Sequence, residues 1–149
     1  MSDWRQELGS SLERQARAAR AEQENAQFEE FLDKVALPAL QDVAMELNGH
    51  GGCEVRVRRA PGAAALTVIT GGSEDIAFRV LKHYGPNGIL PSAEARVNRG
   101  AGFYAKYEGM MRDGRQDYTI EQVTKEDVIG AFIRYFRLVR EGGAAPAAK

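Results

Sequence analysis

The chain has a single cysteine, Cys53, among its 149 residues, so no internal disulfide can stabilise the fold. Long apolar runs are also missing. The longest apolar runs in the chain, such as 63–69, are far shorter than a membrane-spanning helix. The first residues, Met1 to Arg5, are polar and lack the apolar segment of a secretory signal. These absences together predict a cytoplasmic protein without a membrane anchor.

No charge of one sign dominates, because 20 Lys and Arg residues stand against 21 Asp and Glu residues. The net charge of −1 gives no overall field that would attract nucleic acid or anionic lipid. The distribution is nevertheless uneven: residues 1–48 hold 5 basic and 10 acidic side chains, whereas 49–118 hold 10 and 7. Residues 119–149 hold 5 and 4. This distribution allows two interpretations: attraction between an acidic arm and a basic sheet, or two separately solvated surfaces.

Patterns typical of catalysis or metal binding are absent as well. His50 and Cys53 are separated by two glycines, and His83 is the only other histidine, so a four-ligand metal site is not indicated. Segment 71–75 lacks the lysine and the following helix of a phosphate-binding loop. Segment 100–102 lies between two expected strands and is interpreted as a turn. We therefore expect no catalytic residue, no cofactor and no bound metal.

The most informative feature that is present is a hydrophobic period that changes twice. Apolar residues recur at helical spacing up to Leu47, alternate from Cys53 to about Ile120, and return to helical spacing from Thr124 to Arg140. This pattern predicts an α+β fold with N-terminal helices, an antiparallel sheet and a C-terminal helix packed on the sheet. We expect an N-terminal arm over 1–24, helical or partly disordered, one domain over 25–141 and a flexible tail over 142–149.

The arm has a thin apolar stripe. Trp4, Leu8 and Leu12 lie at positions i, i+4 and i+8 of the expected helix. Such a stripe buries too little surface to hold the segment against a core, so the arm either frays or is ordered by another chain. These three residues are our first candidates for an interaction surface.

The following segment predicts a stronger helix with an interruption. Its apolar residues keep one face on both sides of Pro38: Phe28, Phe31, Leu32, Val35, Leu40, Val43 and Leu47. Proline lacks an amide hydrogen and clashes with the preceding turn, so a kink or break is expected near 35–37. The two halves should still share one buried face. Glycine-rich residues 49–52 should end the helix.

Short alternating segments predict the sheet. Strands are expected within 54–58, 65–69, 76–81, 93–98 and 103–108, with a further short strand at 117–122. Glycine-rich turns between them imply an antiparallel meander of five to six strands. One face should be apolar and covered by helices: Val55, Val57, Ile76, Phe78, Val80, Val97, Phe103 and Tyr107.

The last helix should begin at Thr124, which is a good N-cap with Asp127 three residues later. Its apolar stripe includes Phe132 and Phe136. We expect both rings in the main core, against the sheet face that carries Val55 and Val57.

The opposite sheet face combines basic side chains with a tyrosine: Arg56, Arg58, Arg79, Arg96, Tyr104 and Lys106. Arginine and tyrosine on an open sheet are typical of single-stranded nucleic-acid binding. However, Glu54, Glu94 and Glu108 lie on the same strands and favour cross-strand ion pairs instead. We therefore rank nucleic-acid binding last among the hypotheses.

These observations favour a non-enzymatic binding or adaptor protein that acts through protein–protein interaction. We expect a homodimer to which the arm contributes, because exposed tryptophan and leucine on a helix are commonly covered by a partner. A second route to a dimer is the pairing of an edge strand of the sheet with its twin across a two-fold axis. The helix–meander–helix layout resembles that of small dimeric secretion chaperones, which implies a chaperone-like role. The alternative is a small-molecule-binding domain or an enzyme with a pocket between the sheet and the helices.

Overall fold

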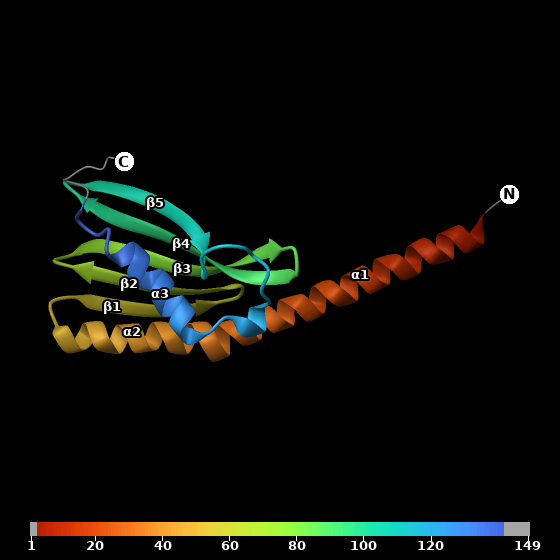
Figure 1. Ribbon diagram of the computed structural model, residues 1–149, viewed down its shortest axis with the longest axis horizontal. Coiled ribbons are helices and arrows are strands. Elements are labelled where there is room, and N and C mark those ends of the chain that lie inside the picture. The colour runs from red at the N-terminus through yellow and green to blue at the C-terminus, as the bar shows by residue number, and fades with distance from the viewer. Residues whose placement is uncertain (1–2, 142–149) are drawn as a thin grey trace.

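A five-stranded sheet, two helices packed on it and one long projecting helix make up residues 3–141, the part of the chain that the computed structural model describes (Figure 1). The elements in chain order are α1 (Trp4–Phe31), the π-helical segment η1 (Leu32–Ala36), α2 (Leu37–His50), β1 (Glu54–Ala60), β2 (Ala63–Thr70), β3 (Ser73–Gly85), β4 (Gly88–Gly100), β5 (Phe103–Met110), the 3₁₀ helix η2 (Ile120–Gln122) and α3 (Lys125–Phe136). The predicted α+β class is confirmed.

The sheet is a meander in which the strands lie in their sequence order, and all neighbouring pairs are antiparallel. Each pair is joined by a two-residue turn, so glycine is required where the backbone enters the left-handed region, as at Gly62 (φ 78°) and Gly102 (φ 76°). Strands β3 and β4 are longer than expected and extend together to a hairpin at Gly85 and Gly88. The predicted meander is confirmed, with five strands.

The N-terminal helix is interrupted immediately before Pro38. The amide of Leu37 donates to the carbonyl of Leu32, one residue farther back than in an α-helix, which produces the wider turn of η1. This turn accommodates the proline ring, and the helix changes direction between α1 and α2 (Figure 1). Leu40 is buried and Val43 packs against the core, so both halves keep one shared buried face, as predicted.

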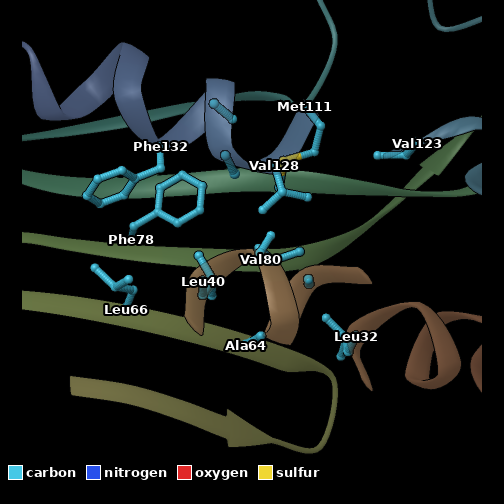
Figure 2. Packing of buried hydrophobic residues seen from close by; sticks show 14 of the residues in the cluster. Leu32, Leu40, Ala64, Leu66, Phe78, Val80, Met111, Val123, Val128 and Phe132 are labelled. Carbon is cyan, nitrogen blue, oxygen red and sulfur yellow. The ribbon is translucent and has the colours of Figure 1, made fainter. Parts of the chain in front are cut away.

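The main core lies between one face of the sheet and the helices α2 and α3 (Figures 1 and 2). Phe132 is buried, as expected, but its aromatic contact on the sheet is Phe78 of the central strand β3, with ring centroids 5.6 Å apart. Phe136 stacks on Phe132 at 5.3 Å and is only partly buried. The valine face of β1 is instead adjacent to α2, which lies along that strand and fills the space expected for α3.

Two predictions about the sheet were wrong. Residues 117–122 form no strand; a capping box fixes η2 there, with the Thr119 amide donating to Gln122 Oε1 at 2.9 Å. Phe103 is 64% exposed, because it begins β5 directly after the turn, beyond the covering helices. A shift in the β4–β5 register at the same end accompanies this turn.

The start of α3 matches its prediction. The Asp127 amide donates to Thr124 Oγ1 at 3.2 Å, and Asp127 Oδ2 accepts from the Thr124 amide at 3.0 Å. After α3 the chain returns to the sheet, where the Arg140 guanidinium lies 2.7 Å from a carboxylate oxygen of Asp75. The flexible tail expected over 142–149 lies outside the described residues.

Candidate interaction surfaces

The arm is the N-terminal part of α1, and local interactions form it. Asp3 caps the helix by accepting a hydrogen bond from the Gln6 amide at 3.3 Å, and Glu7 lies in the first turn, where a negative charge opposes the helix dipole. The residues that follow are mainly Ala, Arg, Gln and Glu, which have high helix propensity. Propensity and capping therefore support this segment without burial.

The apolar stripe of the arm is exposed to solvent. Trp4, Leu8 and Leu12 are 57%, 52% and 56% exposed, and the first buried side chain of α1 is Phe28. Residues 4–24 project from the domain over roughly 32 Å at the usual helical rise (Figure 1). The structure thus brings the three predicted residues together on one helix, where the Arg5 guanidinium lies 4.6 Å from the centre of the Trp4 ring and all three side chains stay more than half exposed.

The base of the arm is fixed to the domain by side chains from distant segments. The Lys82 ammonium donates to the amide oxygen of Asn25 and lies 5.8 Å from the centre of the Phe28 ring. Gln27 donates to Glu121 at 3.2 Å. A groove of about 270 Å³ runs between the helix and η2, and its lining includes Gln27, Glu30, Phe31, Lys34, Val35, Ile120, Glu121 and Val123.

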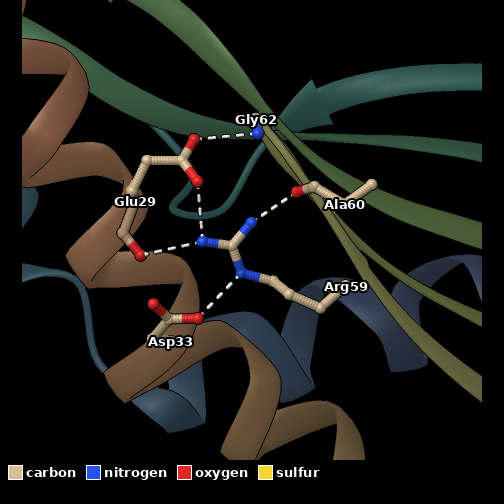
Figure 3. A network of polar contacts seen from close by, with 5 residues as sticks. All are labelled: Glu29, Asp33, Arg59, Ala60 and Gly62. Atoms are coloured by element: carbon tan, nitrogen blue, oxygen red, sulfur yellow. Dashed lines mark hydrogen bonds and ion pairs between the residues drawn. The ribbon is translucent and has the colours of Figure 1, made fainter.

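A network centred on Arg59 provides a second attachment (Figure 3). The guanidinium donates to the Glu29 carboxylate at 2.7 Å, to the Glu29 carbonyl at 3.2 Å, to Asp33 at 2.9 Å and to the carbonyl of Ala60. The Glu29 carboxylate also accepts from the Gly62 amide at 2.8 Å. The network joins the end of α1 to the β1–β2 turn, and charge-assisted bonds of this kind are stronger than neutral ones.

The sequence interpretation missed Arg59. Its position continues the valine face of β1, so an arginine there was a usable signal for a partner across from the strand end. The hydrogen bond from Arg59 holds the pKa of Glu29 below its ordinary value, although partial burial opposes the effect. The same hydrogen bond raises the pKa of Arg59. Both groups are therefore charged at neutral pH.

The outer face of the sheet carries the other predicted residues, and most of them are paired. Arg79 lies 3.0 Å from Glu94, and Lys106 lies 3.2 Å from the same carboxylate. Arg56 contacts Glu54 at 2.6 Å on its own strand, whereas Arg58 is exposed farther along β1. The expected cross-strand ion pairs are present, and they reduce the positive charge available to a phosphate backbone.

Tyr104 is also occupied. The Arg96 guanidinium lies 4.6 Å from the centre of the Tyr104 ring, and the tyrosine hydroxyl donates to the Glu74 carbonyl at 3.2 Å. Arg96 is 3.9 Å from the Glu74 carboxylate. The ring therefore stacks against a side chain of the same sheet, which leaves less of its face for a base.

The histidines and the cysteine lie apart. His50 pairs with Glu46 at 3.1 Å, His83 with Gln116 at 3.1 Å, and Cys53 makes only a weak 4.0 Å contact with the Leu47 carbonyl. Within residues 3–141, no group of three or more His, Cys, Asp or Glu side chains is arranged to hold a metal ion.

A solvent-open hollow of about 550 Å³ lies beside α3. Its lining mixes both charges: Met111, Arg112, Asp113, Glu126, Asp127, Gly130, Ile133, Arg134 and Arg137. Arg134 donates to the Met110 carbonyl at 3.2 Å and lies 3.4 Å from Asp113. The hollow is on the outside of α3, whereas the space between this helix and the sheet is filled by core side chains such as Phe78 and Phe132.

Comparisons with known proteins add no identity. The chain matches no protein-family model, no curated protein and no solved structure. Among the described residues, no helix combines the length and apolar character that crossing a membrane requires. Function is therefore inferred from the surfaces described above.

Proposed function

We propose that this chain is a non-enzymatic protein-binding or adaptor module of the cytoplasm, homodimeric and chaperone-like in action, and that its arm contacts the protein partner. The observation that carries the proposal is the exposed stripe of Trp4, Leu8 and Leu12 on a helix that projects from the domain. Tryptophan is among the residues that contribute most to protein interfaces.

The form of the arm suits helix-in-groove recognition. Anchors at i, i+4 and i+8 present one narrow line of apolar side chains, which a hydrophobic groove on a partner can accept. Because the arm is helical before binding, less conformational entropy is lost on association. Arg14, Arg17 and Arg20 follow the stripe and supply charges for specificity.

The other two hypotheses have less support. Core side chains fill the space between the sheet and the helices, where a small-molecule site was expected. The hollow beside α3 is open to solvent and is lined by side chains of both charges. A nucleic-acid phosphate at the outer sheet face must compete with Glu94 for the Arg79 and Lys106 side chains. Protein binding through the arm requires no rearrangement of the domain.

A comparison of two triple variants tests the proposal. Trp4→Ala/Leu8→Ala/Leu12→Ala removes the stripe, while Met45→Ala/Tyr84→Ala/Ile133→Ala removes three other exposed large apolar groups, from the domain. Native mass spectrometry of the tagged protein purified from its source should show a bound protein other than a second copy with the wild type and the control, and none with the arm variant. Equal retention by both variants, or a small molecule bound in place of a protein, would refute the proposed role of the arm.

A further inference from the structure

One edge of the sheet is open. Among residues 3–141, β5 is the terminal strand of the sheet and pairs only with β4, whereas α2 lies along the opposite terminal strand, β1 (Figure 1). Roughly every second residue of β5 therefore directs its amide and carbonyl groups away from the sheet. Such an edge is a template for another strand unless it is blocked by proline, a bulge or a short length.

The open edge has none of those blocks. Residues 104–110 pair with 92–98 in continuous register, and the register shift lies at the other end of the strand, between Asn98 and Gly100. No proline occurs in β5. Lys106 and Glu108 are the charged residues of β5 that could oppose pairing, so the residues opposite them decide which strand this edge accepts.

We infer that β5 pairs with β5 of a second copy across a two-fold axis at Tyr107, forming one continuous sheet. In one continuous sheet, each residue of β5 must lie opposite a residue of the other copy whose side chain is on the same face. This requirement leaves only a few registers. With Tyr107 on the axis, Lys106 of each copy lies opposite Glu108 of the other. Tyr104 then lies opposite Met110, so residues 104–110 all pair.

The neighbouring registers are electrostatically unfavourable. A shift by one step in one direction sets Lys106 opposite Lys106, and a shift in the other direction sets Glu108 opposite Glu108. Like charges directly opposite on a sheet destabilise it, whereas opposite charges stabilise it. Both side chains are largely exposed, at 63% and 73%, and lie 4.0 Å apart within one strand, so they can reach across to a second copy.

Strand β1 is a weaker candidate for the same contact. If the full strand pairs, Arg56 lies opposite Arg58. The register that joins Glu54 to Arg58 sets Arg56 opposite Arg56, and the register that joins Glu54 to Arg56 pairs only 54–56. The helix α2 also accompanies β1 (Figure 1). Charge complementarity and access therefore both favour β5.

This inference refines the dimer of the proposed function and separates it from the arm. The arm leaves the domain next to the β3–β4 hairpin, where Asn25 accepts a hydrogen bond from Lys82, and the proposed contact uses only residues 104–110 of β5. A β5 dimer thus leaves both arms free for partners. If the arm instead contributes to the dimer, as expected from the sequence, removal of the arm weakens dimerisation.

The register is tested by cross-linking in a Cys53→Ser background. Lys106→Cys and Glu108→Cys proteins should each stay unlinked alone, because their own copies lie diagonally, about 7–8 Å apart, beyond disulfide reach. Mixed and oxidised, they should form a disulfide heterodimer. A homodimeric disulfide from either variant alone, or none from the mixture, would overturn the register.

Charge exchange and truncation complete the test. Lys106→Glu and Glu108→Lys should each weaken dimerisation by about tenfold or more, and their mixture should recover it, as measured by sedimentation. A chain starting at Gln23 should remain as dimeric as the full chain. Loss of the dimer on truncation would place the interface on the arm and overturn this inference while the proposed function stands. A monomeric full chain would refute the dimer, and partner binding by the arm would still be judged by its own triple variant.

Discussion

The two halves of the N-terminal helix have the same secondary structure and different sources of stability. Residues 4–24 are held by capping, propensity and local ion pairs such as Glu13 with Arg17 at 3.9 Å. From Phe28 to Leu47 the helix buries apolar side chains against the sheet. Isolated helices of this composition are marginal in water. The exposed half contributes no side chain to the buried core, which supports the proposal that its apolar stripe contacts a partner.

The largest expected difference between the halves is in core packing. Phe28→Ala should lower the free energy of unfolding by about 3–5 kcal/mol, because the ring is fully buried and its removal leaves a cavity. Leu12→Ala in the arm should lower it by less than about 0.5 kcal/mol. Urea unfolding followed by circular dichroism measures both values. A cost at Leu12 similar to that at Phe28 would show that the arm is buried in solution.

The second prediction concerns the attachment of the helix at Arg59. Arg59→Met keeps the apolar stem and removes the guanidinium, leaving Glu29 without its strongest partner, at a cost of about 1–3 kcal/mol. Arg58→Met is the matched control, since its side chain is exposed on the other face of the same strand. Its effect should stay within about 0.5 kcal/mol. Equal effects at the two positions would mean that the network in Figure 3 adds no stability.

Sequence alone could predict the part of this comparison that depends on periodicity. The change of period specified the helices and the meander, and the T-x-x-D pattern specified the cap at Thr124, because these signals are local. Arg59 and Glu29 are 30 residues apart, and nothing local reveals that they meet. The length of β3 and β4 and the path of α2 beside β1 also depend on tertiary packing. Phe103 was misplaced because alternation does not show where the helical cover ends.

The third prediction uses the lowered pKa of Glu29. A carboxyl whose pKa is lower in the folded state than its ordinary 4.5 stabilises the fold above that pH, and loses this contribution as the pH falls through the folded pKa. The wild type should therefore lose more stability between pH 5.5 and pH 3 than Glu29→Gln does. Since the Glu29 side chain is 40% exposed, the difference should be under about 1 kcal/mol. Chemical unfolding at each pH measures it, and parallel curves for the two proteins would contradict it.

The last comparison is between two similar caps on helices with different surroundings. Asp3 accepts from the Gln6 amide at the start of the exposed arm, and Thr124 accepts from the Asp127 amide at the start of the packed helix α3. Thr124→Ala should lower the global free energy of unfolding by about 1 kcal/mol. Asp3→Ala should leave the thermal midpoint unchanged, because fraying of the arm exposes no core residue.

Amide hydrogen exchange shows what the Asp3 cap does locally. Loss of a cap worth about 1 kcal/mol should raise exchange in the first turns of α1 several-fold, while the amides of α2 keep their protection. Binding of a partner along Trp4, Leu8 and Leu12 should reverse the loss, since a groove that holds the stripe also holds the helix around it. If Asp3→Ala lowers protection in α2 as well, the two halves unfold as one unit. The arm would then belong to the cooperative domain, and its exposed stripe would no longer identify a separate binding element.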